Sequence, residues 1–185
     1  MLKDKINAYE PFDEQEKSDK EQFLKFIDTF DDVLTRDNIF GHFTASAFVV
    51  NKERTKMVVV YHIINDGWAY PGGHADGIED LLSVALREVE EETGLKARVL
   101  DDNIFAIVSA PVLGHIKRGK YVSGHIHFDC VYLMEADENI PLKFREDESK
   151  GVKWVKLEDA YDESFCDFVR PVNKRLIKKL NNRGV

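Results

Sequence analysis

Four acidic side chains crowd one short stretch in the middle of the chain: Glu88, Glu90, Glu91 and Glu92. Apolar residues at helical spacing precede and interrupt this stretch, so it is predicted to form an amphipathic helix. Residues three and four positions apart on a helix share a face, which brings Glu88, Glu91 and Glu92 together. Like charges at this spacing repel each other, and acids in a last helical turn oppose the helix dipole. A bound Mg²⁺ or Mn²⁺ would reverse both penalties, whereas the alternative is a charge run exposed to solvent.

The residues that flank the glutamates favour the cation site. Gly73 is followed after five residues by Glu79, and after seven more by the run from Arg87 to Leu95 (REVEEETGL). This spacing resembles the Nudix box at every defined position from Gly73 to Leu95. The resemblance implies a loop-helix-loop that holds divalent cations against a diphosphate, with Mg²⁺ as the cofactor and Mn²⁺ as a substitute.

The shared helical face supplies three expected metal ligands, the carboxylates of Glu88, Glu91 and Glu92. The resemblance adds the carbonyl group of Gly73 to the metal ligands and places Glu79 at the mouth of the same site. Arg87 is expected to pair with an acid of the loop and so to fix the box, since a guanidinium fork suits carboxylates.

The general base that assists the attacking water is left open. Glu92 or Glu91 could act from within the box, and Glu146 or Glu148 could approach from the loop before the expected strand Val152–Val155. Glu148 is slightly favoured, because an acid shortly before such a strand is common in the family that this chain resembles. The expected catalytic residues are therefore Glu92, Glu91, Glu148 and Arg87. The alternative for the loop acids is a solvated loop without a catalytic role.

Two further groups of residues are candidates for substrate contact. His125, His127 and Asp129 alternate along an expected strand and therefore point to one side of it. They could line the substrate pocket, pack in the core or bind a transition metal, although the sequence offers no matching set of ligands elsewhere. The basic loop His115–Gly124 contributes Lys117, Arg118 and Lys120, which could hold a distal phosphate or could only solubilise the loop. The expected substrate-binding residues are His125, His127, Lys117 and Arg118.

Length and composition indicate a folded protein with one domain and an extension. The chain has 185 residues, of which 43% are hydrophobic and 32% are charged. Its net charge of −8 argues against a broad basic surface for nucleic acid, so no DNA partner is expected. Cys130 and Cys166 show neither metal spacing nor a disulfide framework, and Cys130 is expected to be reduced and buried. The sequence lacks a signal-like core and a run of roughly 18 apolar residues, so a cytoplasmic protein without membrane contact is expected.

Residues 1–40 are expected to form an N-terminal extension with one amphipathic helix, Asp19–Leu34, and residues 41–185 to form the Nudix domain. The helix could pack on the domain, cover the substrate or contact a second copy in a homodimer. Strands are expected at Phe43–Val50, Met57–Ile64, Ile104–Ala110 and His125–Met134, with Pro111 ending the third and Pro171 opening a last helix. Strands with a helix between them and another at the end predict an α/β fold. The resemblance implies the Nudix-type α/β/α sandwich with a mixed sheet.

The main hypothesis for function is Mg²⁺-dependent hydrolysis of a nucleoside diphosphate linked to another group. Pro111 stands sixteen residues beyond Leu95, a position that the resemblance associates with ADP-ribose, so a small nucleotide of this kind is the expected substrate. A pyrophosphohydrolase acting on a nucleoside triphosphate or on capped RNA is the alternative enzyme, and the acidic charge balance argues mildly against RNA. A Nudix-like sensor that binds without turnover is the alternative from another class. Such sensors commonly lose box glutamates, which this chain keeps.

Overall fold

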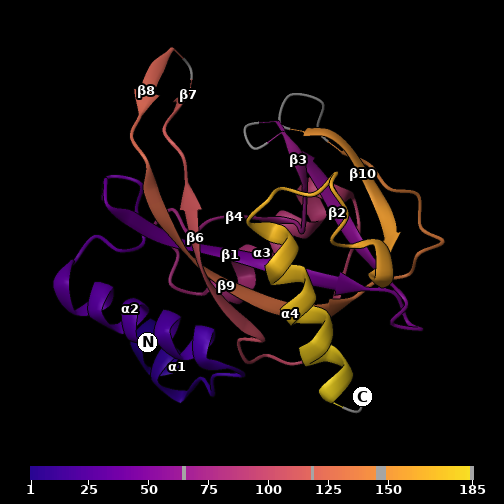
Figure 1. The fold of residues 1–185 in the computed structure, drawn as a ribbon, viewed down its shortest axis with the longest axis horizontal. Coiled ribbons are helices and arrows are strands. Elements are labelled where there is room, and N and C mark those ends of the chain that lie inside the picture. Colours follow the sequence, from indigo (N-terminus) through magenta and orange to yellow (C-terminus); the bar gives the residue numbers. More distant parts are fainter. Residues whose placement is uncertain (64–65, 118, 145–148, 184–185) are drawn as a thin grey trace.

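The computed structural model of the chain describes residues 1–63, 66–117, 119–144 and 149–183, and it has the predicted α/β/α architecture with a mixed sheet (Figure 1). Within these ranges, eight strands form one sheet of order β10-β2-β1-β9-β5, in which β3 also pairs with β2, β4 with β1 and β6 with β9. These strands are β1 (Gly41–Val50), β2 (Lys56–His62), β3 (Gly67–Ala69), β4 (Gly72–His74), β5 (Arg98–Val99), β6 (Ala106–Val112), β9 (His125–Glu135) and β10 (Ser149–Lys156). A separate hairpin consists of β7 (His115–Lys117) and β8 (Lys120–Val122).

The centre of the sheet is the parallel pair of β1 and β9, while the other pairings are antiparallel. Every residue of β1 is buried, which is typical of a strand that is covered on both faces. Because side chains alternate along a strand, Phe43 and Ala45 point to one face of the sheet, whereas His42 and Thr44 point to the other. The two faces therefore carry different groups from the start of the same strand.

Helices cover both faces of the sheet. The helices α1 (Leu2–Ala8), α2 (Glu14–Thr29) and α3 (Leu81–Thr93) pack on one face, and α4 (Val169–Asn182) packs on the other. In Figure 1, α4 crosses in front of the sheet and α3 lies behind it. The rings of Phe26 and Phe128 stack at a centroid distance of 4.2 Å, and Phe23 meets Phe128 edge-on at 5.2 Å, so α2 shares the core of the sheet. Within the described residues, no helix is both long enough and apolar enough to cross a membrane.

The N-terminal segment contains two helices where the sequence predicts one. The helix α1 precedes the predicted helix, and α2 spans Glu14–Thr29 rather than Asp19–Leu34. The side chain of Asp13 accepts a hydrogen bond of 2.9 Å from the backbone N–H of Glu16, and this N-cap fixes the earlier start. Phe30 has an extended backbone and ends the helix. The apolar periodicity thus located the buried face but not the ends of α2.

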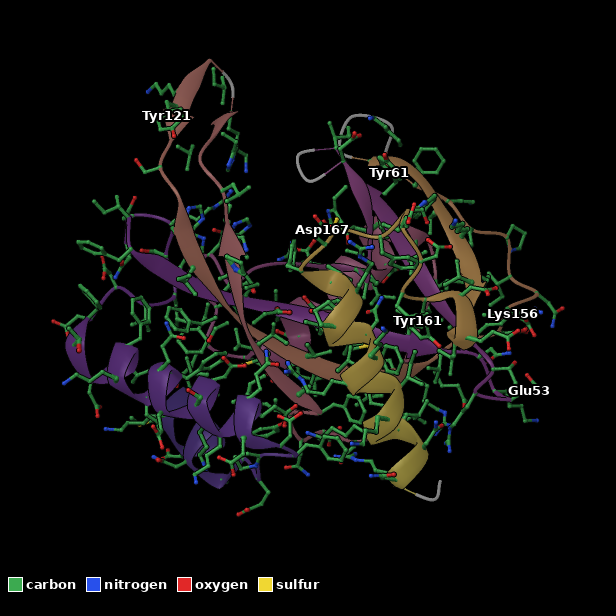
Figure 2. All side chains as sticks on the ribbon, viewed as in Figure 1. Glu53, Tyr61, Tyr121, Lys156, Tyr161 and Asp167 are labelled. Atoms are coloured by element: carbon green, nitrogen blue, oxygen red, sulfur yellow. The ribbon has the colours of Figure 1, made fainter. Side chains whose placement is uncertain are left out.

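Two predictions around β6 are wrong. Pro111 lies inside β6 rather than after it, because among the described strands β6 pairs with β9 alone, and an edge strand tolerates a residue without an N–H. The stretch His115–Gly124, expected to be a loop, forms the β7–β8 hairpin, which projects away from the sheet (Figure 1). Tyr121 lies near its tip and is 72% exposed (Figure 2). The free cysteine Cys130 is buried, as predicted.

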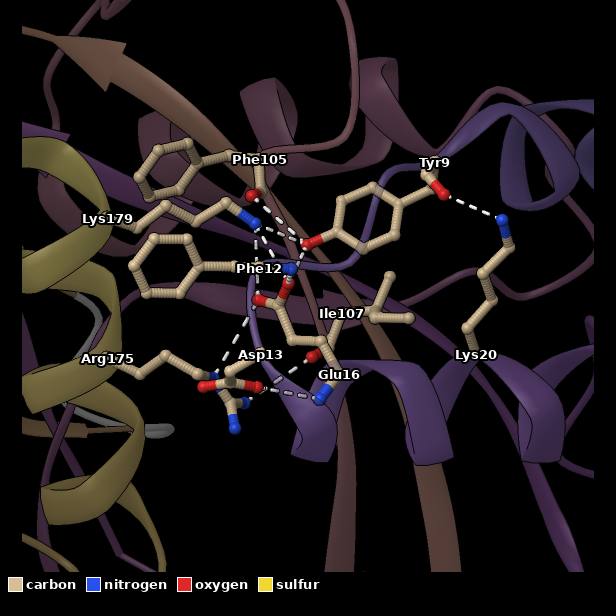
Figure 3. A network of polar contacts seen from close by, with 9 residues as sticks. All are labelled: Tyr9, Phe12, Asp13, Glu16, Lys20, Phe105, Ile107, Arg175 and Lys179. Carbon is tan, nitrogen blue, oxygen red and sulfur yellow. Dashed lines mark hydrogen bonds and ion pairs between the residues drawn. The ribbon is translucent and has the colours of Figure 1, made fainter. Parts of the chain in front are cut away.

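A buried polar network joins α2 to α4 beside the β6 edge (Figure 3). Glu16 has no exposed surface, and the ammonium group of Lys179 donates to its Oε2 at 2.9 Å. The guanidinium nitrogen Nε of Arg175 lies 3.7 Å from Oε1 of Glu16, and the hydroxyl of Tyr9 donates to the same carboxylate. Burial lowers the pKa of Lys179, and the charge of Glu16 acts against this shift. Because buried charges are stable only when paired, the network fixes residues of the N-terminal segment to the last helix.

Candidate active site

The carboxylates of Glu88 and Glu92 on α3 face the backbone of β4. A Cβ atom built on Gly73 would lie 2.4 Å from the carboxylate carbon of Glu88, so only glycine permits this approach. One helical turn later, Oε2 of Glu92 accepts a hydrogen bond of 3.0 Å from the N–H of Gly72. Gly73 therefore admits the carboxylate of Glu88 because it has no side chain, while the backbone of Gly72 binds the carboxylate four residues later.

Arg87 contacts two acids of its own helix. Its guanidinium nitrogens lie 2.9 Å from a carboxylate oxygen of Glu88 and 3.6 Å from one of Glu91. The predicted pairing of Arg87 with an acid of the preceding loop is therefore wrong. Asp76 of that loop forms a two-pronged pair with Arg36 instead, at 2.7 and 2.6 Å. The charge of Arg87 offsets the repulsion between neighbouring carboxylates on the helix.

N-terminal residues hold the loop that leads into α3. The backbone N–H of Leu2 donates to Oε1 of Glu79 at 2.8 Å, so this glutamate faces α1. The N–H of Gly77 donates to the carbonyl oxygen of Leu34 at 2.9 Å. Together with the pair between Arg36 and Asp76, these bonds connect the segment before β1 to the box loop. The N-terminal segment therefore positions the entry to the helix that carries the carboxylates.

The residues expected to bind a cation supply only oxygen donors, which suits Mg²⁺: Gly73, Glu88, Glu91 and Glu92. Among the described residues, Arg87 contacts Glu88 and Glu91, and the N–H of Gly72 contacts Glu92. The carboxylates are like charges, which repel each other until a cation lies between them. The chemistry of the donor set thus fits a divalent cation, and the ligand role of these residues stays a prediction.

Replacing Gly73 with alanine is expected to lower kcat/KM for phosphoanhydride hydrolysis by about 100-fold, roughly 2.7 kcal/mol. The reason is that the new methyl group would displace the carboxylate of Glu88. Gly151→Ala is the matched control, because a Cβ atom there would approach its nearest neighbour, Trp68, only to 3.5 Å. Steady-state kinetics on both variants would check this, and a Gly73→Ala protein as active as Gly151→Ala would contradict the proposed contact.

Four histidines from three strands meet in a second cluster, which we call the histidine cluster: His42 of β1, His74 of β4, and His125 and His127 of β9. The closest ring pairs have centroids 4.9 to 5.1 Å apart. The prediction that His125, His127 and Asp129 share one side of their strand is confirmed by these contacts and by the bonds of Asp129 to β1. The sequence signalled two of the four histidines and missed the two from β1 and β4.

Burial keeps three imidazoles of the histidine cluster neutral, those of His42, His74 and His127. It is the main cause that lowers the pKa of His42 to about 4, of His74 to about 3 and of His127 to about 2. Neighbouring imidazoles and the charge of Lys117 add to the shifts of His74 and His127. Neutral rings do not attract a phosphate by charge. They offer lone pairs, N–H donors and flat apolar surface instead.

Asp129 is a buried carboxyl group beside the histidine cluster. The hydroxyl groups of Thr44 and Ser46 each donate to its Oδ1 at 2.8 Å. The hydroxyl of Tyr70 donates to its Oδ2 at 3.4 Å. Burial raises the pKa of Asp129 to about 6, although these hydrogen bonds act to lower it. Asp129 therefore connects β9 to β1 and to the approach of the box.

Three candidates lie outside the described residues: Arg118, Glu146 and Glu148. Lys117 ends β7 on the projecting hairpin, and its influence on the pKa of His74 and His127 places its charge near the histidine cluster. The substrate-binding role of Lys117, His125 and His127 stays a prediction. His42 and His74 could not be found from spacing, because only the pairing of β1 with β9 and of β4 with β1 brings them together.

Comparison with known proteins gives a consistent family assignment. The NUDIX domain profile matches residues 41–180. The chain is 32% identical over 138 residues to an RNA pyrophosphohydrolase of Pelagibacter ubique, covering 71% of this chain and 86% of that protein. It is 26% identical over 121 residues to an RNA pyrophosphohydrolase of Sphingopyxis alaskensis, covering 62% and 76%. The fold is similar to that of a MutT protein from Methanosarcina mazei, with a TM-score of 0.58, 20% identity and coverage of 76% and 96%. It is also similar to that of an Ap4A hydrolase from C. elegans, with a TM-score of 0.54, 19% identity and the same coverage.

Proposed function

This chain belongs to the NUDIX domain family, whose hydrolases act on a pyrophosphate linkage, and we propose that the linkage it cleaves is in the 5′-triphosphate end of RNA. The similarity to two RNA pyrophosphohydrolases, which spans most of both relatives, carries this proposal. Water would attack a phosphorus atom of the anhydride, and the P–O bond to the departing phosphates would break. The products would be RNA with a 5′-monophosphate, pyrophosphate and a proton.

The box residues supply what such a reaction requires of the protein. Phosphoryl transfer depends on charge neutralisation and on an oriented water rather than on covalent chemistry. Divalent cations, when bound, neutralise phosphate oxygens and lower the pKa of the attacking water. Glu88, Glu91 and Glu92 would hold these cations, and Arg87 keeps two of the carboxylates in place. Glu91, Glu92, Glu146 and Glu148 remain the candidates for the base that takes the proton, with Glu148 slightly favoured.

The β7–β8 hairpin supports an RNA chain as the substrate rather than a small nucleotide. It exposes Tyr121 and Ile116 by 72% and 73%, and it carries Lys117 and Lys120. An exposed ring can stack on an unpaired base, and nearby lysines can contact the phosphate backbone, which are the two contacts that single-strand binding combines. This local patch answers the objection that a protein of net charge −8 repels RNA.

The alternatives have weaker support. The ADP-ribose hypothesis depends on Pro111, whose side chain points to the sheet face opposite the histidine cluster, because its partner is Ile126 and side chains alternate. Pro111 is accounted for as an edge-strand residue without any substrate. A nucleoside triphosphate stays the nearest alternative, since it contains the same anhydride. A sensor without turnover is disfavoured, because the glutamates of the box are all present.

With Mg²⁺, kcat/KM for a 5′-triphosphorylated RNA oligonucleotide is expected to exceed that for ADP-ribose by at least about tenfold, roughly 1.4 kcal/mol of transition-state binding. Pyrophosphate and phosphate release would be measured on this RNA, capped RNA, the nucleoside triphosphates and ADP-ribose. Tyr121→Ala should raise KM for RNA at least about threefold and leave KM for GTP unchanged. A protein that prefers ADP-ribose or a free triphosphate would overturn the RNA proposal while leaving the family assignment intact.

A further inference from the structure

We propose that His42, His125 and His127 form a binding site for a divalent transition metal such as Zn²⁺, with His74 beside them. This site is distinct from the carboxylate site of the box in both its donors and its position on the sheet. Its ligand atoms come from imidazoles, whereas the box offers only oxygen. The two sites are therefore expected to select different metals.

The ring nitrogens of the three histidines lie near one another, and one pair is already at the separation of two ligands of one ion. One nitrogen from each of His42, His125 and His127 lies within 4.8 Å of the other two. Nε2 of His125 and Nε2 of His127 are 3.2 Å apart. Two nitrogens bound to one tetrahedral zinc at about 2.0–2.1 Å would lie roughly 3.3 Å apart. The observed separation therefore matches one edge of a zinc coordination tetrahedron.

The buried ring nitrogens of His42 are the feature that points most directly to a ligand. His42 is 4% exposed, and within the described residues neither Nδ1 nor Nε2 has a partner at full hydrogen-bond geometry, although the backbone of Asn38 lies close enough to act on the ring. Buried polar atoms are almost always paired, and leaving one unpaired costs about 1–3 kcal/mol. A metal bound to either nitrogen would remove that cost. Even if the backbone of Asn38 satisfies one ring nitrogen, the other is left without a protein partner among the described residues.

Nδ1 of His125 makes the kind of hydrogen bond that a metal-binding histidine makes through the ring nitrogen that does not bind the metal. Nδ1 of His125 lies 2.9 Å from the backbone carbonyl oxygen of Ser123, which only an N–H at Nδ1 can satisfy. In the neutral ring, Nε2 then carries the lone pair. Metal-binding histidines generally donate their other N–H to a carbonyl or carboxylate, which fixes the ring and its tautomer. His125 therefore presents Nε2 toward His127 in the form that a metal requires.

Rigid strands hold these side chains. His42 and His127 are direct partners in the parallel pairing of β1 and β9, and His125 lies two residues before His127 on the same side. His74 is held by the pairing of β4 with β1, and its ring centroid lies 5.1 Å from that of His42 and 4.9 Å from that of His127. His74 is thus placed to become a fourth ligand or to leave that position to water.

The nearby charges allow a cation but do not attract it. Arg36 and Lys117 both add unfavourable positive charge, and Asp76, which pairs with Arg36, offsets it only in part. Binding must therefore come from imidazole coordination rather than from the field of the protein. Zn²⁺ fits this requirement, because it binds sets of three histidines, while Mg²⁺ prefers oxygen. The competing explanation for the 3.2 Å contact is a simple N–H···N hydrogen bond between two packed rings.

Zn²⁺ binding to the full-length, chelator-treated protein tests the proposal. Isothermal titration would be run in millimolar Mg²⁺, which saturates the carboxylate site, and Co²⁺ would be added separately to record visible absorption of a nitrogen-coordinated ion. We expect one equivalent of Zn²⁺ per chain. His125→Gln and His127→Gln should each weaken it at least about tenfold. His115→Gln, which changes a histidine of the hairpin, and Glu92→Gln, which changes the box, should leave Zn²⁺ affinity within about twofold.

The variants separate the two sites and the two explanations. Circular dichroism would confirm that each variant is folded, and His125→Gln keeps the test decisive if the more buried His127→Gln is not. If Zn²⁺ fails to bind, the histidine cluster is only a packed group of rings. If Glu92→Gln removes Zn²⁺ binding while His125→Gln does not, the ion occupies the box instead. Either result would overturn the proposal, whereas loss of binding in His125→Gln alone would support it.

Discussion

Glu92→Gln is expected to lower kcat by at least about a thousandfold, roughly 4 kcal/mol, without unfolding the protein. Glutamine keeps the shape of the side chain, and its amide oxygen can accept the hydrogen bond that Oε2 of Glu92 now accepts from the N–H of Gly72. It removes the charge that would bind a cation or accept a proton. Removal of one like charge from the end of α3 should, if anything, raise the melting temperature slightly. Initial rates at saturating Mg²⁺ and thermal unfolding would be measured on the same preparation.

Glu90→Gln is the matched control for this substitution. Glu90 lies on the same helix but on another face, 3.8 Å from the ammonium group of Lys96 and largely exposed. The substitution Glu90→Gln changes the net charge of the box by the same amount as Glu92→Gln, but it leaves the proposed cation ligands unchanged. We expect Glu90→Gln to keep its rate within about twofold, since exposed ion pairs contribute little. An equal loss of activity in both variants would contradict a role of Glu92 in the active site. So would a Glu92→Gln protein that retains over half of the activity.

Glu16→Gln is expected to lower the free energy of unfolding by about 3–5 kcal/mol. The substitution would leave the buried ammonium group of Lys179 without its carboxylate partner and would remove one carboxylate from beside the guanidinium of Arg175. Urea denaturation followed by circular dichroism would measure the loss. Glu14→Gln, on the same helix and exposed, should change the free energy of unfolding by less than about 0.5 kcal/mol.

The Glu16 result also bears on domain organisation. We infer that residues 1–40 form an extension of a domain that spans residues 41–185, and that the extension is fixed to the domain by this network and by the box loop. The bonds from Leu2 to Glu79 and from Gly77 to Leu34 make the same connection on the other side. A Glu16→Gln protein as stable as Glu14→Gln would show that the extension is only loosely attached.

The box helix was predictable because its signals are local. The spacing of the apolar residues predicted the helix, and the spacing of the glutamates predicted their common face. Gly94 predicted where the helix ends. Gly94 does adopt the left-handed conformation, with φ of 73°, and its N–H bonds the carbonyl of Glu90. Alternation within β9 likewise placed His125 and His127 on one side. Each of these inferences involves residues within about one helical turn or one strand of each other.

The rest depended on pairing between distant segments, which spacing does not encode. His42 joins His127 only because β1 and β9 are parallel neighbours. Glu16 meets Lys179 only because α2 and α4 pack beside the β6 edge. The partner of Arg87 was mistaken because Arg36, from outside the motif, takes the loop acid Asp76.

Anomalous diffraction from crystals of the full-length protein soaked in Mn²⁺ would test the central claim most directly, namely that the box carboxylates form the catalytic cation site. Mn²⁺ can replace Mg²⁺ among oxygen ligands. The account predicts anomalous density bounded by the carboxylates of Glu88, Glu91 and Glu92, next to the carbonyl group of Gly73. It also predicts that this density disappears in Glu92→Gln crystals. Density elsewhere on the chain, with none at these carboxylates, would contradict it.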